Sequence, residues 1–195
     1  MTNNKRTENL DNSTEQLKLM VYSALMATLT AVGAYIVIPI GPVPIVLQNL
    51  FVMLAGLLLG GRWALTSVGV YLLAGAIGLP VFAGGTGGIG KFVGPTGGYL
   101  VGFAAAAYII GIISQRGKGR TGIDILAMAA GTLVIYAFGV PWLKAVTGMS
   151  FSKAAAVGMV PFIPGDALKI AVAIPIVRAL RPIIAGTINT LHVTE

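Results

Sequence analysis

Four long stretches without a charged side chain limit what this chain can fold into. They cover residues 19–61, 63–90, 92–115 and 125–143. A helix needs about 20 apolar residues to cross the ~30 Å hydrocarbon core of a bilayer, so the first stretch can hold two spans. Only 10% of all residues are charged, whereas a soluble domain has about 25%. We therefore predict an all-α integral membrane protein.

A cluster of prolines and glycine, PIGPVP at 39–44, divides the first stretch. Proline cannot continue a helix, so the cluster is typical of a tight turn. With this turn the sequence predicts a six-transmembrane-helix bundle, with spans at 17–38, 44–60, 62–79, 96–114, 122–143 and 164–185. We expect residues 1–16 to form a polar cytosolic tail and residues 17–190 to form one six-helix membrane domain.

The distribution of positive charge predicts the orientation of the chain. The net charge of +7 would suggest nucleic-acid binding in a soluble protein, but the cations lie between apolar segments, so we expect no nucleic-acid partner. Six spans place both termini on one side, together with nine of the thirteen cations: Lys5, Arg6, Lys18, Arg62, Arg116, Lys118, Arg120, Arg178 and Arg181. The other four, Lys91, Lys144, Lys153 and Lys169, lie at or near the opposite side. Because cytoplasmic loops are rich in Lys and Arg, we predict a plasma-membrane protein with both termini in the cytosol.

Few residue types suited to catalysis are present. The sequence has no cysteine, six acidic residues and a single histidine, His192. Disulfides, iron–sulfur clusters and thiolate catalysis are thereby excluded, and little remains for a metal site. We expect no metal, no cofactor and no enzymatic activity of the chain itself.

A glycine-rich segment at 83–91, AGGTGGIGK, contains a formal GxGxxG and nearly a P-loop. Phe92 stands where a P-loop needs a hydroxyl for magnesium, and no strand is expected before the glycines. We therefore do not interpret the segment as a nucleotide site. It can be a plain connector between the third and fourth spans, but we favour a loop that covers a ligand. Gly84 and Gly85 permit a close backbone approach, and Phe82 and Tyr99 supply aromatic surface.

Asp166 and Lys169 are the strongest polar signal in the apolar part of the chain. They are three residues apart at the start of the last expected span, and therefore share one helical face. Ionisable groups at membrane depth are costly and usually functional. The alternative is a structural role, with Asp166 capping the helix and Lys169 reaching the headgroups. As a binding site, the pair would suit a ligand with both acceptor and donor ends.

Two further groups have both a structural and a functional interpretation. Gln48 and Asn49 lie at the outer end of the second expected span, where their amides can bind a ligand or tie helices together. Ala27 and Ala31 are typical of close helix packing in lipid, which can occur within the bundle or against another membrane subunit.

Five blocks stand in a fixed order along the chain: GPVPIVLQNL at 41–50, AGLLLG at 55–60, GLPVFAGG at 78–85, FVGPTGGY at 92–99 and PGDALK at 164–169. Together they resemble the BioY family, the biotin-specific substrate-binding (S) subunits of energy-coupling factor (ECF) transporters. The resemblance extends over roughly residues 17–185 and leaves the N-terminal tail unexplained.

The resemblance implies a six-helix bundle of the ECF S-component type with an outward-facing biotin pocket. The implied pocket residues are Asp166, Lys169, Lys91, Gln48, Asn49, Phe82, Gly84, Gly85 and Tyr99. Asp166 would accept the ureido N–H groups, and Lys169, helped by Lys91, would answer an acceptor or the carboxylate; which cation meets which end stays open. The implied partners are a transmembrane coupling subunit and two ABC ATPases, with Ala27 and Ala31 as the docking surface.

Two other functions compete with this interpretation. A stand-alone secondary transporter or facilitator for a small carboxylated vitamin could use the same pocket chemistry. It is disfavoured because no acidic relay spans the bundle: Asp124 is expected at the cytosolic end and Asp166 at the outer end. A membrane-embedded enzyme would need a nucleophile with its base, or a metal cluster, and the sequence offers neither within the spans.

Overall fold

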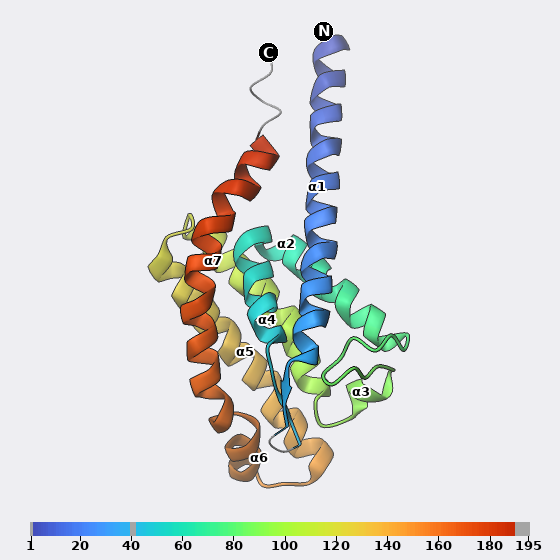
Figure 1. The fold of residues 1–195 in the computed structure, drawn as a ribbon, viewed down its shortest axis with the longest axis vertical. Helices are drawn as coiled ribbons and strands as arrows, with labels where there is room; N and C mark the ends of the chain where they lie inside the picture. The colour runs from blue at the N-terminus through green and yellow to red at the C-terminus, as the bar shows by residue number, and fades with distance from the viewer. Residues whose placement is uncertain (1, 40–41, 190–195) are drawn as a thin grey trace.

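The chain folds into a bundle of long helices with a small two-stranded hairpin at one end (Figure 1). The computed structural model describes residues 2–39 and 42–189, and the side chains of 13–39 and 42–184. The elements are α1 (Thr2–Tyr35), β1 (Val37–Ile38), β2 (Ile45–Val46), α2 (Gln48–Ala76), α3 (Gly90–Val93), α4 (Gly97–Arg116), α5 (Thr121–Thr147), α6 (Phe151–Gly158), the 3-10 turn η1 (Val160–Phe162) and α7 (Ile163–Asn189).

Within the described residues, five helical segments are long and apolar enough to cross a membrane. They are Ser13–Tyr35, Gln48–Ala76, Gly97–Arg116, Thr121–Thr147 and Phe151–Ile184. The predicted multi-pass helical membrane protein is confirmed, but the count of six separate helices is not. The reason lies in α2, which runs through the position where the second and third expected spans were to be separate.

A break at Gly60 divides α2 into two arms. Gly60 has φ 77° and ψ 173°, a conformation open essentially to glycine alone, while the residues around it are helical. The arms 48–59 and 61–76 diverge from the break as the two sides of an inverted V (Figure 1). Each arm is shorter than the roughly 20 residues that a straight spanning helix needs. We call this feature the α2 break.

Helix α2 lies at the centre of the packing and contacts α1, α4 and α7, while α5 packs against α4, α6 and α7. Small residues permit the closest approaches, as expected for helices in lipid. A Cβ on Gly56 would come within 2.7 Å of the Ile110 side chain. Fully buried apolar side chains fill the space between these helices, among them Val52, Met53, Ala106, Ile110, Ala127 and Met128.

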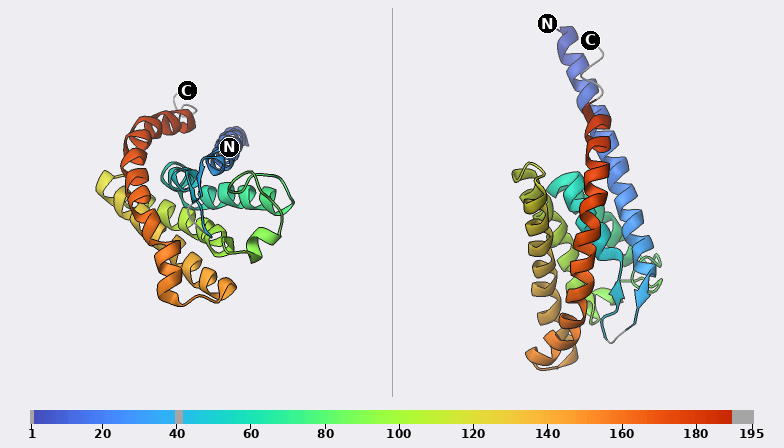
Figure 2. Two further views of the ribbon diagram at one scale, coloured as in Figure 1. Left: turned by 60° about the horizontal axis from the view of Figure 1, so that its bottom comes forward. Right: turned by 60° about the vertical axis from the view of Figure 1, so that its left-hand side comes forward.

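The two ends of the bundle differ in construction. The β1–β2 hairpin, α3 and α6 gather at one end, which we call the hairpin end (Figures 1 and 2). The start of α1, the end of α7 and the α2 break lie toward the opposite end, where α1 extends beyond the other helices (Figure 2). The expected polar tail is part of this extension, because from Thr2 its backbone continues the first membrane helix without a break. His192 lies outside the described residues.

Two local elements at the hairpin end were not predicted. Flanking the Pro/Gly cluster, Val37 pairs with Val46 and Ile38 with Ile45 in an antiparallel register, so a hairpin surrounds the expected turn. Residues 40 and 41 of that turn are outside the described part of the chain. Helix α6 forms the start of the fifth long segment and is capped by Ser150, whose Oγ accepts a hydrogen bond from the Lys153 main-chain N–H.

Candidate binding pocket

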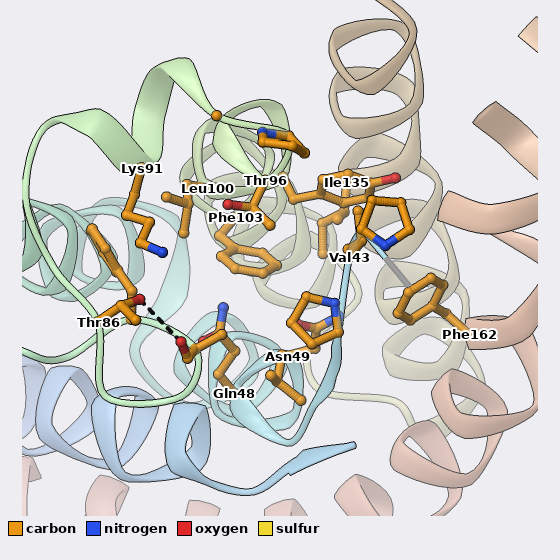
Figure 3. A pocket seen from close by; sticks show the side chains of 18 of the residues that line it. Val43, Gln48, Asn49, Thr86, Lys91, Thr96, Leu100, Phe103, Ile135 and Phe162 are labelled. Atoms are coloured by element: carbon orange, nitrogen blue, oxygen red, sulfur yellow. Dashed lines mark hydrogen bonds between the residues drawn. The ribbon is translucent and has the colours of Figure 1, made fainter. Parts of the chain in front are cut away.

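A cavity of about 450 Å³ opens at the hairpin end, between the hairpin, the segment 77–96 and helices α2, α4, α5 and α7. Its volume lies in the range of small-molecule sites. The lining combines aromatic and aliphatic side chains with a few polar groups (Figure 3). The wall residues used below are Val43, Gln48, Asn49, Phe82, Thr86, Lys91, Thr96, Tyr99, Phe103, Tyr136, Phe162 and Lys169.

The structure brings six of the nine predicted pocket residues to the cavity wall: Gln48, Asn49, Phe82, Lys91, Tyr99 and Lys169. Asp166, Gly84 and Gly85 are not part of the wall. Asp166 is only 3% exposed and contacts two of the wall residues from behind. The two glycines shape the segment that closes the cavity.

Lys169 and Asp166 form a buried ion pair on the first turns of α7. The Lys169 Nζ lies 3.1 Å from Asp166 Oδ1, and the two residues are 8% and 3% exposed. The other carboxylate oxygen, Oδ2, accepts a hydrogen bond from the Tyr136 hydroxyl on α5. A carboxylate can accept about four hydrogen bonds and an ammonium can donate three. Lys169 therefore retains donors for a ligand. The Tyr136 hydroxyl uses its proton in the hydrogen bond to Asp166, so its oxygen can still accept a hydrogen bond from a ligand.

Gln48 and Asn49 form the start of α2 and line the cavity (Figure 3). Gln48 is 3% exposed, and its Oε1 accepts a hydrogen bond of 3.2 Å from the Tyr71 hydroxyl on the second arm of α2. Asn49 Oδ1 is buried and has no hydrogen-bond partner within the described part of the chain. A buried acceptor left unpaired costs free energy, and this residue lines the cavity. Asn49 is thus prepared to accept a hydrogen bond from a ligand.

Lys91 enters the cavity from the opposite side to Lys169. It stands on α3, which lies across the hairpin end from α7 (Figure 1). Its side chain points into the cavity on the side of Thr86, away from Phe162 (Figure 3). Among the side chains that the structure describes, Lys91 forms no ion pair, whereas Lys169 is paired. The cavity therefore presents one uncompensated positive charge at one side and a neutral, hydrogen-bonded pair at the other.

Aromatic side chains form part of the cavity wall. Phe82 is 2% exposed and packs edge-to-face on Tyr71 and Phe92, with ring centroids 5.5 and 5.7 Å apart. Its ring lies directly over Gly75, where a Cβ would come within 2.0 Å. Tyr99 is also buried, and its hydroxyl donates to the Gly158 carbonyl at 2.8 Å. These contacts hold the rings in place before any ligand arrives.

The segment 77–96 is anchored at both ends. Gly84 N–H donates to the Ala34 carbonyl at 3.1 Å, and the Tyr35 hydroxyl donates to the Pro80 carbonyl at 2.5 Å. At the far end, Trp142 Nε1 on α5 donates to the Gly94 carbonyl at 2.9 Å. The segment also closes on itself, because Phe82 N–H donates to the Thr86 carbonyl. We call residues 77–96 the cover; Gly84 and Gly85, both at φ 70°, give it its turn.

Several wall residues were not predicted, above all Tyr136, and also Thr86, Thr96, Phe103 and Phe162. Tyr136 lies in the middle of an apolar span, 30 residues from Asp166, and no local pattern connects the two. Only the packing of α5 against α7 brings them together. The one signal in the sequence was a tyrosine hydroxyl within an apolar span, because a buried tyrosine hydroxyl usually has a hydrogen-bond partner.

The expected docking residues on α1 differ in exposure. Ala27 is 6% exposed and belongs to the core, whereas Ala31 is half-buried. The neighbouring Ala24 and Thr28 are exposed, and the Thr28 hydroxyl is satisfied by the Ala24 carbonyl at 2.9 Å. The small residues that the bundle leaves uncovered are therefore on the adjacent stripe of the helix.

The profile of the BioY family matches residues 3–186. The chain belongs to the BioY family. The resemblance inferred from the five sequence blocks is thereby confirmed. Within the side chains described, no group of three histidine, cysteine or acidic residues is placed to hold a metal ion.

Named relatives cover most of the chain. A probable biotin transporter BioY of Pyrococcus horikoshii is 45% identical over 158 residues, which is 81% of this chain and 93% of that protein. Biotin transporters BioY of Rhizobium etli and Thermotoga maritima are 42% and 40% identical, over 83% and 85% of this chain and 91% and 96% of those proteins. These relatives are named as transporters, a class distinct from enzymes.

A solved structure has the same fold. It is the crystal structure of the S-component for biotin from an ECF-type ABC transporter, with a TM-score of 0.81 and 34% sequence identity. The match covers 87% of this chain and 93% of that one. This BioY chain is therefore a multi-pass membrane protein with the fold of an ECF S-component.

Proposed function

We propose that this chain is the biotin-binding S-component of an ECF transporter, which captures the vitamin in the cavity at the hairpin end. The observation that carries the proposal is the charge layout of the cavity. An unpaired Lys91 stands at one side, the Lys169–Asp166 pair stands at the other, and aromatic side chains line part of the wall. The named relatives and the matching solved structure, all described as biotin proteins, support the choice of ligand.

Biotin has chemistry that complements this layout. Its ureido ring carries two N–H donors and one carbonyl, its valerate chain ends in a carboxylate, and the part between is apolar. We place the ureido ring at the Lys169 side, where Lys169 donates to the carbonyl and Tyr136 and Asn49 accept from the N–H groups. The carboxylate then lies at Lys91, whose charge has no other partner among the described side chains. A charge-assisted hydrogen bond to a carboxylate is about twice as strong as a neutral one.

Asp166 acts through its neighbours in this proposal. Its two oxygens hold Lys169 and the Tyr136 hydroxyl, which fixes the direction of both groups toward the cavity. This role differs from the direct ureido contact that the family resemblance implied for Asp166. Gln48, held by Tyr71, supports the start of α2 beside Asn49, while Phe82 and Tyr99 contact the apolar middle of the ligand.

The proposal includes an orientation in the membrane. We count each arm of α2, although shorter than a straight spanning helix, as one pass between the hairpin end and the α2 break, which gives six passes and places both termini on one side. By the excess of Lys and Arg, that side is the cytosol and the hairpin end faces outward. The two ABC ATPases and the transmembrane coupling subunit supply the energy, and the chain itself needs no cofactor. A coupling helix would contact the exposed Ala24 and Thr28 together with Ala31, rather than the buried Ala27.

Calorimetry on the detergent-solubilised chain tests the ligand. We expect biotin to bind with one site per chain, and biotin amide, which lacks the carboxylate charge, to bind more weakly. Absence of biotin binding by a folded chain would contradict the proposal. Uptake assays separate it from the remaining alternative: sustained, gradient-driven biotin uptake into liposomes by the chain alone would indicate a stand-alone transporter.

A further inference from the structure

The α2 break interrupts the main-chain hydrogen-bond ladder at the end opposite the cavity. In a continuous helix the Gly61 N–H would donate to the Leu57 carbonyl, four residues earlier. At Gly60 the backbone leaves the helical conformation, with φ 77° and ψ 173°, and turns the next N–H away from that carbonyl. One donor and one acceptor are thereby released inside the bundle, where unpaired backbone groups are costly.

Two side chains from other helices take up the released groups. The Gly61 N–H donates to Oε1 of Gln115, near the end of α4, at 3.3 Å. The Leu57 carbonyl accepts from Nη2 of Arg181 on α7 at 3.2 Å. The two main-chain groups left unpaired at the break are therefore hydrogen-bonded by two different helices, α4 and α7.

Arg181 is held in place by a network that uses both ends of its guanidinium group. Nη1 donates to the Gly119 carbonyl at 2.8 Å and to Asp124 Oδ2 at 2.9 Å. Nη2 also donates to Ser114 Oγ at 3.1 Å, and that hydroxyl donates to Asp124 Oδ1 at 2.5 Å. Asp124 and Ser114 are each 3% exposed. The planar guanidinium group has several N–H donors in fixed directions and can bind all of these acceptors together, whereas the single ammonium of a lysine cannot.

The backbone contact between α4 and the break supplies an independent observation. A Cβ on Gly111 would lie 2.2 Å from the Gly61 nitrogen, so α4 touches the main chain of the break. A Cβ on Gly60 would lie 2.1 Å from Nε2 of Gln115, so the glutamine side chain occupies the space that a larger residue would need. The break is thus enclosed by α4 on one side and bonded to α7 on the other.

We propose that Gln115 and Arg181 bridge the α2 break and thereby position the ligand-binding end of α2 relative to α7. We call the two hydrogen bonds, Gln115 to Gly61 and Arg181 to Leu57, the splice. The arm 48–59 extends from the break to Asn49, while α7 extends from Arg181 to Lys169, so the contacts at the break relate two residues of the cavity wall to each other. The arm is roughly 18 Å long, and a 5° change in its direction moves Asn49 by about 1.5 Å. Binding groups must be held to about 0.5 Å. Gln115 and Arg181 are therefore positioning residues that act on affinity without touching the ligand.

Arg178→Gln is the matched control for Arg181→Gln. Arg178 stands one turn earlier on the same helix, is exposed, and within the described part of the chain bonds only to the Thr121 hydroxyl, at 3.0 and 3.3 Å. Gln115→Leu provides a second, uncharged perturbation of the splice. The inference rests on biotin as the ligand, so calorimetry with biotin is the first measurement. We expect at least tenfold weaker binding for Arg181→Gln and Gln115→Leu, and a change of less than twofold for Arg178→Gln.

A distance measurement tests the splice independently of the ligand. The natural sequence has no cysteine, so Phe51→Cys, half-buried on the arm 48–59, and Leu168→Cys on α7, 66% exposed, can carry the only two spin labels. We expect the label distance between the arm 48–59 and α7 to shift or broaden in Arg181→Gln and Gln115→Leu, and to stay unchanged in Arg178→Gln.

The two measurements separate the possible failures. If Arg181→Gln and Gln115→Leu both leave the biotin affinity unchanged, or both leave the label distance unchanged, the proposed positioning role of Gln115 and Arg181 is wrong. If the unmodified chain does not bind biotin, the proposed function fails, while the label distances still decide whether Gln115 and Arg181 position α2. If Arg181→Gln does not fold, Gln115→Leu, which leaves the Asp124–Arg181 ion pair intact, carries both measurements.

Discussion

Neutralising one member of the Asp166–Lys169 pair should destabilise the chain far more than neutralising both. In Asp166→Asn, the Lys169 ammonium, in a residue 8% exposed, loses the carboxylate 3.1 Å away and keeps its charge in a site with little water. Removing one partner of a buried ion pair costs about 3–5 kcal/mol, whereas replacing both partners by apolar groups of similar size is often nearly neutral. We expect this loss for Asp166→Asn and for Lys169→Met, and at most about 2 kcal/mol for the double variant.

Thermal unfolding in detergent measures these differences. For a chain of this size, 1 kcal/mol corresponds to about 2–4 °C in the unfolding midpoint, so each single variant should lose on the order of 10 °C. The double variant should recover most of that loss. Lys153→Met, which removes an exposed lysine of α6 at the same end of the bundle, is the control and should unfold within about 1–2 °C of the parent.

Biotin calorimetry on the same proteins separates binding from stability. Loss of a hydrogen bond from a charged group costs about 1.5–3 kcal/mol, or about 10- to 150-fold in affinity, so Lys169→Met and the double variant should both bind that much more weakly. The reasoning is refuted if the double variant is as unstable as the sum of the singles, because the charges would then be uncoupled. Full biotin affinity in the folded double variant would show that Lys169 does not bind the ligand.

Three further changes have separate readouts. Lys91→Met should weaken biotin about 10- to 150-fold by calorimetry but leave biotin amide unchanged; equal losses for both ligands would show that Lys91 does not meet the carboxylate. Gly60→Ala should lower the free energy of unfolding by about 2–3 kcal/mol, because φ 77° and ψ 173° suit only glycine; Gly69→Ala in the same helix, where a Cβ meets nothing within 4 Å, is the control and should not destabilise. Tyr136→Phe should cost about 1–3 kcal/mol in thermal unfolding because Asp166 loses a buried donor, whereas Tyr108→Phe, 40% exposed, should change nothing; a silent Tyr136→Phe would contradict the role of this hydroxyl.

The membrane class of the fold could be predicted because it depends on composition summed over long segments. A helix boundary is a local matter of main-chain conformation, and there the prediction was less complete. Between 44–60 and 62–79 we expected a connection, but a single glycine at a glycine-only conformation is enough to turn the chain, so α2 has no loop. The hairpin beside the Pro/Gly cluster consists of strands only two residues long, too short for any periodic pattern.

The candidate site likewise contains residues that could be predicted from the sequence and residues that could not. Asp166 and Lys169 could be found from the sequence because charges are rare in an apolar span, and their spacing places them on one face. Tyr136 could not, since its relation to Asp166 depends on how α5 and α7 pack. Nor could Arg181 be distinguished from Arg178: both count equally as cytosolic cations in the sequence, yet one is enclosed by acceptors from three helices and the other is exposed.

The attachment of the cover to α1 has a mechanical consequence. Hydrogen bonds from Gly84 and to Pro80 attach the cover to Ala34 and Tyr35 in the last turn of that helix. The cover and the first helix are therefore expected to move together. The exposed stripe at Ala24 and Thr28 lies on the same rigid rod, about 10–15 Å away along its axis. A shift of this stripe along the helix axis would therefore be transmitted to the cover through the Gly84–Ala34 and Tyr35–Pro80 hydrogen bonds.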